Sequence, residues 1–176
     1  MTGKKLLTPR FMAEAGIIAA LYFVLTIINP LAFGQVQVRF SEALCILPFF
    51  TPAAVPGLFI GCLLSNLAGS SLGPYDIVFG SLATLAAAYL TYIIGRIGTK
   101  RSTKQIGASK WLLPLPAVVI NAFIVAAILN HYLQFLFLES VLFVALGQVA
   151  ACYVLGMPLF FLLNRYKQAL FKRKQG

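Results

Sequence analysis

Hydrophobic residues form long, nearly uninterrupted runs along this chain. A helix that crosses about 30 Å of hydrocarbon needs about 20 apolar residues. Four windows fit, with their flanks: Phe11–Ile28, Val55–Leu67, Ile77–Gly95 and Leu112–His131. A fifth, Ser140–Leu163, closes the chain. The pattern predicts an all-α membrane protein.

The region Ala43–Leu67 is either one long tilted span or two shorter ones. Pro52 and Pro56 favour two, because proline removes a backbone donor and disfavours helix in the residue before it. The first of the two, Glu42 to Phe50, has only nine residues and cannot cross the hydrocarbon alone. Interrupted helices of this kind often line a substrate cavity.

Positive charge gathers in three clusters outside the apolar runs. They lie at about 1–10, 96–110 and 165–176, and together they hold every Lys and Arg except Arg39. Cytoplasmic segments concentrate these residues, so all three clusters should lie inside. An even number of crossings must then separate the first two clusters. We expect a single integral membrane domain, 1–176, with six spans and both termini cytoplasmic.

Composition supports this interpretation and excludes other classes. Of the 176 residues, 60% are hydrophobic and 10% are charged, which leaves too little polar surface for a soluble globule. The net charge of +10 sits beside apolar runs, so it suits anionic lipid headgroups, and no nucleic acid partner is expected. Three cysteines without zinc-site spacing and a lone His131 predict no bound metal.

Four acidic residues occur in the chain: Glu14, Glu42, Asp76 and Glu139. The last three fall at the outer ends of spans, where an ionisable group is costly unless it is paired, hydrated or used. Glu42 and Asp76 can instead be helix-start acids, with Ser41 as the cap beside Glu42. Arg39 either pairs with Glu42 at the surface or contacts a ligand, and the two are compatible.

Asn121 and Gln148 lie near the middle of their spans, and Asn66 ends the third span on the outer side. Amides at mid-depth either join helices or bind a heterocycle through paired hydrogen bonds, and both roles stay open here. Glu139 precedes Gln148 by nine residues, which puts the two on opposite faces of an ideal helix. We therefore favour Gln148 over Glu139 as a pocket residue.

The connection between the first two spans contains an alternating run, Gln35 to Phe40. This period of two predicts a short extended segment with Gln35, Gln37 and Arg39 on one side. We expect it to cap an opening from outside.

Enzyme patterns are weak in this sequence. Gly69 to Gly73 matches Gly-x-Ser-x-Gly, but that pattern works as a strand-to-helix elbow, and here it connects membrane spans. An intramembrane serine hydrolase that uses Ser71 and His131 stays an alternative. The sequence contains no Walker loop, so we expect no ATP hydrolysis by this chain.

Longer runs of the sequence resemble one family. They are VRFSEAL at 38–44, LPFFTPAAVPGLFIGC at 47–62, DIVFGSLATL at 76–85, Pro114–Pro116 with Asn121, and Gly147-Gln148 with YVLG at 153–156. These segments resemble the QueT family, and the similarity extends over most of the chain.

The resemblance implies an S component, the substrate-binding membrane subunit of an energy-coupling factor transporter for queuosine precursors. Family members resemble one another in six helices with both ends inside, and are associated with 7-deazaguanine bases such as queuine or the aminomethyl form. Uptake would need a transmembrane coupling protein and two ATPase subunits that use ATP. The chain itself would then be a transporter subunit in a prokaryotic plasma membrane. It would not be an enzyme and would bind no cofactor of its own.

The same resemblance implies a docking surface on the first helix. S components typically contact the coupling protein through small residues four apart, which let another helix approach closely. Ala15 and Ala19 fit, with Gly16 and Ala20 as a parallel pair. Packing against a neighbouring helix of the same chain is the alternative.

A deazaguanine edge offers donors that match carboxylates such as Glu42 and Asp76, and a carbonyl acceptor that matches Asn, Gln or Arg. The candidate substrate-binding residues are Arg39, Glu42, Asn66, Asp76, Asn121, Gln148 and Glu139. Some relatives carry Glu where this chain has Gln148, so the exact ligand stays open. An S component for a different vitamin and a stand-alone facilitator are further alternatives.

Overall fold

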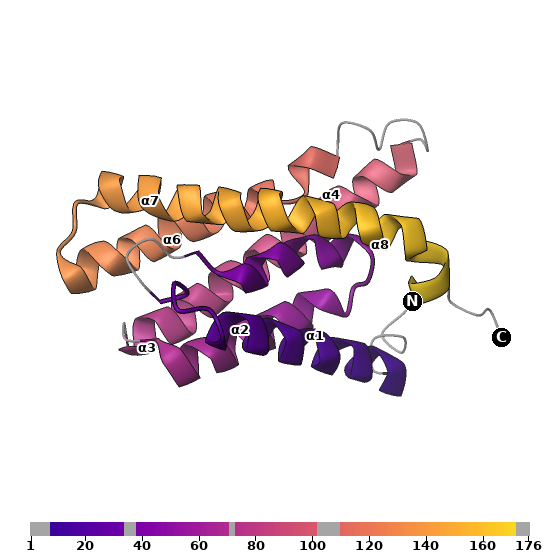
Figure 1. Ribbon diagram of the computed structural model, residues 1–176, viewed down its shortest axis with the longest axis horizontal. Coiled ribbons are helices and arrows are strands. Elements are labelled where there is room, and N and C mark those ends of the chain that lie inside the picture. The colour runs from indigo at the N-terminus through magenta and orange to yellow at the C-terminus, as the bar shows by residue number, and fades with distance from the viewer. Residues whose placement is uncertain (1–7, 34–37, 71–72, 102–109, 172–176) are drawn as a thin grey trace.

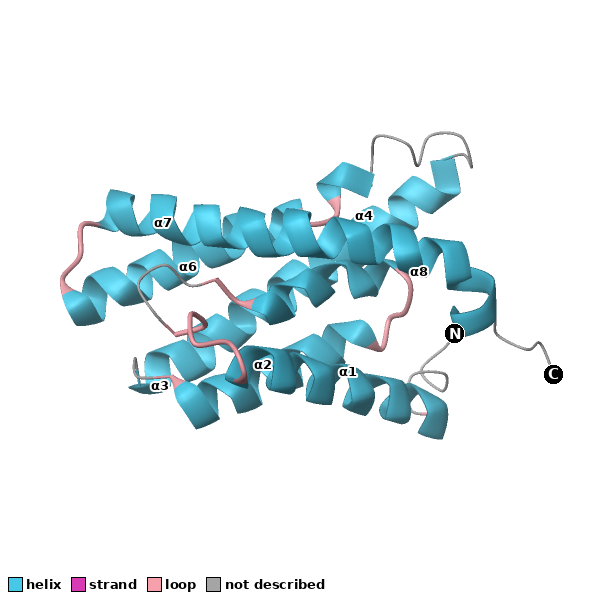
Figure 2. Ribbon diagram, viewed as in Figure 1, coloured by secondary structure: helices cyan, strands magenta, loops and turns pink. Residues whose placement is uncertain are grey.

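The computed structural model describes residues 8–33, 38–70, 73–101 and 110–171. All regular structure in these ranges is helical, without a strand, so the all-α class predicted from the sequence is confirmed. The long helices lie roughly along one common axis (Figure 1). Short loops join them at the two ends of the bundle (Figure 2).

The described helices follow one another along the chain in a simple order. They are α1 (Pro9–Ile27), η1 (Phe40–Phe49), α2 (Ala54–Gly69), α3 (Gly73–Tyr75), η2 (Asp76–Gly80), α4 (Ser81–Arg101), η3 (Lys110–Leu112), α6 (Leu115–Leu133), α7 (Phe137–Val149), η4 (Ala150–Leu155) and α8 (Gly156–Phe171). The elements η1 and η3 are 3-10 helices, whereas η2 and η4 are π-helical turns inside longer spans.

Four helical segments in the described ranges are long and apolar enough to cross a membrane: Pro9–Ile27, Gly73–Gly98, Lys110–Leu133 and Phe137–Tyr166. Two apolar helices, η1 and α2, are shorter. Large apolar side chains such as Leu138, Leu146 and Val154 are exposed, as a lipid-facing surface requires. The number of six spans and the cytoplasmic termini stay predictions.

The short helix η1 lies at the centre of the bundle (Figure 1). Its residues from Ser41 to Pro48 are all buried, and it packs against α1, α2, α4, η4 and α8. A 3-10 helix rises about 2.0 Å per residue, so ten residues extend about 20 Å and still fall short of the hydrocarbon thickness. Its free backbone groups therefore depend on the surrounding protein.

The break between η1 and α2 lies at Phe50 to Ala53 and includes Pro52, as predicted. Pro56 is not part of the break, contrary to our expectation. It lies in the first turn of α2, where the missing N–H would have no intrahelical partner. The Thr51 hydroxyl donates to Glu14 Oε2 at 3.0 Å and ties this break to α1.

The helices α1 and α2 pack closely through glycine. A Cβ atom at Gly57 would lie 2.8 Å from the Ala15 carbonyl oxygen, and one at Gly61 would lie 2.8 Å from that of Ala19. Ala15 and Ala19 are buried in this contact, which favours the alternative of packing within the chain, and a docking role for this pair stays a prediction. The parallel pair faces outward, since Gly16 and Ala20 are both exposed.

The helix ends nearest the three basic clusters gather at one end of the bundle. The start of α1, the end of α4 and the end of α8 lie at the right in Figure 1, and α3 lies at the opposite end. Three clusters on one side of a membrane require such an arrangement.

Candidate functional site

The apolar bundle contains an interior group of polar side chains. Its members are at most 6% exposed: Tyr22, Arg39, Glu42, Asn66, Asp76, Thr84, Asn121 and Gln148. Burial of charges and amides is costly unless they are paired. The structure thus buries six of the seven candidate binding residues, which come from η1 and its N-cap, α2, η2, α6 and α7.

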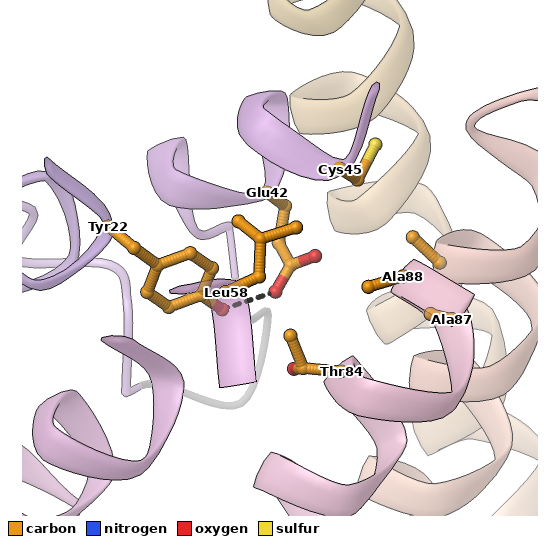
Figure 3. Close-up of a pocket in the computed structure, with 8 residues that line it drawn as sticks. Tyr22, Glu42, Cys45, Leu58, Thr84, Ala87 and Ala88 are labelled. Carbon is orange, nitrogen blue, oxygen red and sulfur yellow. Dashed lines mark hydrogen bonds between the residues drawn. The ribbon is translucent and has the colours of Figure 1, made fainter. Parts of the chain in front are cut away.

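Glu42 is hydrogen-bonded at both carboxylate oxygens. The Tyr22 hydroxyl donates to Oε1 at 2.6 Å, a bond drawn in Figure 3, and Asn121 Nδ2 donates to Oε2 at 3.3 Å. Glu42 therefore connects α1, η1 and α6. The predicted Ser41 cap is wrong, because η1 has no side-chain cap bond and Ser41 Oγ accepts from Thr26 Oγ1 at 2.7 Å.

Asp76, not Glu42, is the partner of Arg39. Arg39 Nη2 lies 3.5 Å from Asp76 Oδ2, and both side chains are buried. The surface pair of Arg39 with Glu42 that we considered is therefore wrong. Ser70 Oγ donates to the same Asp76 Oδ2 at 2.5 Å, so Asp76 has a more specific role than starting a helix.

Arg39 also holds the connection that follows α1. Its Nε donates to the Ala32 carbonyl at 3.0 Å, and its guanidinium lies 5.4 Å from the Phe33 ring centroid. Its Nη1 lies 3.9 Å from Cys62 Sγ on α2. Gln35 and Gln37 lie outside the described residues, so the predicted extended segment is described only at its end.

Gln148 belongs to the interior group, and Glu139 does not. The Cys152 thiol lies 3.6 Å from Gln148 Oε1 and 3.6 Å from the Glu42 carbonyl oxygen, which brings Gln148 close to η1. Glu139 is exposed, as the nine-residue spacing predicted. A pocket role for Glu139 stays a prediction.

A small cavity lies beside Glu42 (Figure 3). It is lined by Tyr22, Glu42, Cys45, Leu58, Thr84, Ala87, Ala88 and Ala117. Its volume of about 10 Å³ suits one water molecule at most, whereas small-molecule pockets commonly measure about 300–1,000 Å³. This conformation is therefore closed, and a bicyclic base would require the surrounding helices to separate.

Two members of the interior group, Tyr22 and Thr84, were missed by sequence reasoning. Tyr22 carried a usable signal, because a hydroxyl in the middle of an apolar span needs a hydrogen-bond partner. Thr84 carried less, since its hydroxyl contacts Cys62 Sγ at 3.3 Å and also donates to the carbonyl oxygen of its own helix at Gly80, at 3.2 Å.

The residues considered for other chemistries lie outside this group. His131 is exposed and lies among the rings of Tyr75 and Tyr132. Ser71 falls outside the described residues, so a pairing of Ser71 with His131 is not described. Within the described ranges, no group of three or more His, Cys, Asp or Glu residues is placed to hold a metal ion.

Comparison with known proteins identifies the family of this chain. The chain is 36% identical over 72 residues to the queuosine precursor transporter QueT of Lactococcus lactis subsp. cremoris (strain MG1363). That alignment covers 39% of this chain and 41% of the relative, less than half of its length. No solved structure matches the chain. The family model described as QueT transporter matches residues 12–165, and the chain therefore belongs to the QueT transporter family.

Proposed function

We propose that this chain is the S component of an energy-coupling factor importer and that it captures a queuosine precursor from outside the cell. Membership of a transporter family supports transport, and the Lactococcus relative is named for queuosine precursors. The observation that carries the proposal is the group of carboxylates, amides and one guanidinium buried inside an apolar bundle. A flat, nitrogen-rich base is the kind of ligand that such groups bind.

Charge balance favours a cationic base within this class. With both carboxylates ionised, Glu42 and Asp76 carry two negative charges against the single positive charge of Arg39. A cationic aminomethyl group on the base would balance the remaining charge, whereas a neutral base would leave it buried and uncompensated. The proposed preference is therefore for a 7-deazaguanine whose 7-substituent carries a protonated amine, such as the aminomethyl base or queuine, over a base without a basic amine.

Uptake in this proposal needs partners from the same importer. Two ATPase subunits hydrolyse ATP, a transmembrane coupling protein transmits the movement, and the S component reorients in the plasma membrane. Gly16 and Ala20 offer the exposed small-residue pair for docking, and a Cβ atom at Gly16 would meet nothing within 4 Å. Close approach of a second helix is compatible with that open face.

Ligand identity is tested on the purified protein. Mass spectrometry first identifies what copurifies, and thermal-shift titrations then compare the aminomethyl base, queuine, guanine and biotin. A ligand at 100 times its Kd stabilises the protein by about 2.7 kcal/mol, which is readily measured. Stabilisation by the 7-deazaguanine bases supports the proposal, and stabilisation by guanine or biotin alone contradicts it.

The S-component role is tested separately, by uptake in cells. Uptake of the base should require the coupling protein and the ATPases. Gly16→Leu should abolish uptake and leave ligand binding intact, whereas Ala127→Leu, at an exposed position on α6, should leave both intact. Uptake that persists without any ATPase subunit would identify a stand-alone facilitator and contradict the S-component role.

A further inference from the structure

Three polar atoms near Asp76 lack a hydrogen-bond partner in the described part of the chain: Arg39 Nη2, Asn66 Oδ1 and Asp76 Oδ1. Their side chains are 4%, 1% and 0% exposed. Buried polar atoms are nearly always hydrogen-bonded, so each exception calls for an explanation. Three such atoms beside one another leave hydrogen-bonding capacity that the described residues do not use.

The three atoms belong to one small region. Arg39 and Asp76 form the ion pair described above, and Asn66 Nδ2 donates to the Asp76 carbonyl oxygen at 3.0 Å. A Cβ atom at Gly80 would lie 2.8 Å from Asp76 Oδ1 and 3.0 Å from Asn66 Nδ2. The glycine thus leaves the space into which both side chains fit.

The hydrogen bonds fix which atom of the Asn66 amide is free. Its Nδ2 also lies 3.6 Å from Cys62 Sγ, so the nitrogen faces two acceptors and the oxygen is the unpartnered atom. The region therefore offers one donor, on Arg39, and two acceptors, on Asp76 and Asn66. Glu42 differs, because donors from Tyr22 and Asn121 already occupy both of its oxygens.

One donor and two acceptors complement a ligand edge that has one acceptor and two donors. The six-membered ring of a guanine or 7-deazaguanine has this edge, made of a carbonyl oxygen, a ring N–H and an exocyclic amine. Glu42 lies three residues after Arg39, which is one turn of a 3-10 helix, or about 6 Å along its axis. A base that reaches both would span the region between the two carboxylates.

We infer that Arg39, Asp76 and Asn66 form the subsite that recognises the guanine-type edge of the base, with the 7-substituent directed toward Glu42. This inference rests on the proposed function and adds an orientation to it. Arg39 Nη2 donates to the carbonyl oxygen, Asp76 Oδ1 accepts from the ring N–H, and Asn66 Oδ1 accepts from the exocyclic amine. Binding widens the Arg39–Asp76 contact, because the closed conformation leaves no room for the edge.

The test compares two ligands that differ only at the exocyclic amine. Titration calorimetry measures the Kd of the aminomethyl 7-deazaguanine and of its analogue with hydrogen in place of that amine. The parent protein should bind the amine-bearing base about tenfold to a hundredfold more tightly, because the analogue leaves Asn66 Oδ1 unpartnered. Asn66→Leu should bind the two ligands with nearly equal affinity.

Glu42→Gln is the matched control. It should weaken the binding of both ligands and preserve the ratio of their two Kd values. An Asn66→Leu variant that keeps the parent's ratio overturns the inference. If that variant does not fold, the Kd values of the parent protein are sufficient for the test. Equal affinity of the parent for the two ligands overturns the inference as well. A parent that binds neither ligand but binds another compound overturns the proposed function itself, an outcome distinct from an altered ratio.

Discussion

Glu42 and Asp76 lie in the same apolar interior but differ in how completely they are hydrogen-bonded. Donors from two helices occupy both oxygens of Glu42. Asp76 has one oxygen shared between Ser70 and Arg39 and one without a hydrogen-bond partner among the residues that the structure describes. Stability alone would favour a hydrogen-bond partner for every oxygen of both buried carboxylates. Glu42 therefore joins helices in this closed conformation, whereas one oxygen of Asp76 stays available to the proposed ligand.

The two carboxylates also lie in different types of helix. Asp76 begins the π-helical turn that ends at Gly80, while Glu42 lies within the ten-residue 3-10 helix η1. Local π turns are frequent at functional sites, because they redirect side chains and leave backbone groups less constrained. The π-helical turn thus coincides with the incompletely bonded carboxylate.

The largest effect should come from Arg39→Met, which removes the only described cation beside Asp76. Breaking a buried ion pair from one side costs about 3–5 kcal/mol of stability, because the other charge stays buried. Chemical unfolding in detergent measures it. The double variant Arg39→Met with Asp76→Leu should recover most of the loss.

Arg10→Met is the control, since its pair with Glu14 is exposed and contributes about 0–1 kcal/mol. A loss for Arg39→Met as small as that of the control would show that the Asp76 pair is not buried as described.

A smaller effect is expected for Tyr22→Phe, which leaves one Glu42 oxygen without its donor. The cost should be about 1–3 kcal/mol, the usual penalty for an unsatisfied buried group. The same unfolding experiment measures it, with Tyr89→Phe on the exposed face of α4 as the control, expected to stay within about 0.5 kcal/mol. Equal stability of the two Phe variants would remove Glu42 from its structural role.

Gly61→Ala should perturb Glu42 without touching Asp76. The added Cβ would lie 2.7 Å from Tyr22 Cβ, so α1 must move away from α2, at a cost of about 1–3 kcal/mol. Gly16→Ala, on the open face of the same helix pair, should instead stabilise by about 0.5–1 kcal/mol. If Gly61→Ala and Gly16→Ala change the free energy of unfolding equally, α1 and α2 are not in the contact described.

The smallest effect is expected at Glu139, whose side chain is exposed. Glu139→Gln should change stability by less than about 0.5 kcal/mol and should leave ligand affinity unchanged. Thermal unfolding of the purified variant measures its stability, and titration with the aminomethyl 7-deazaguanine measures its affinity. A marked loss of affinity would return Glu139 to the set of binding residues.

The features that the sequence predicted well are local ones. The length of the apolar runs predicted the long helices, and proline predicted the break at Pro52. The nine-residue spacing of Glu139 and Gln148 predicted that they lie on opposite faces of a helix. Each of these depends on neighbours along the chain. Pro56 shows the limit, since the same residue type begins a helix as readily as it ends one.

The features that escaped the sequence depend on which helices become neighbours. Arg39 has an acid three residues away and pairs with another 37 residues away, because η1 packs beside α4, the helix that continues from η2. Two parallel small-residue pairs on α1 were equally suited to packing or docking. The glycines on α2, also four residues apart, could have indicated that one of these pairs faces inward.

Titration calorimetry with the aminomethyl 7-deazaguanine, on the parent and on three variants, tests the central claim most directly. Glu42→Gln and Asp76→Asn should each lose about 1–3 kcal/mol of binding free energy, roughly tenfold to a hundredfold in Kd, while Glu139→Gln should match the parent. Parent-like affinity in both interior variants would contradict the account, because the buried carboxylates would then take no part in binding.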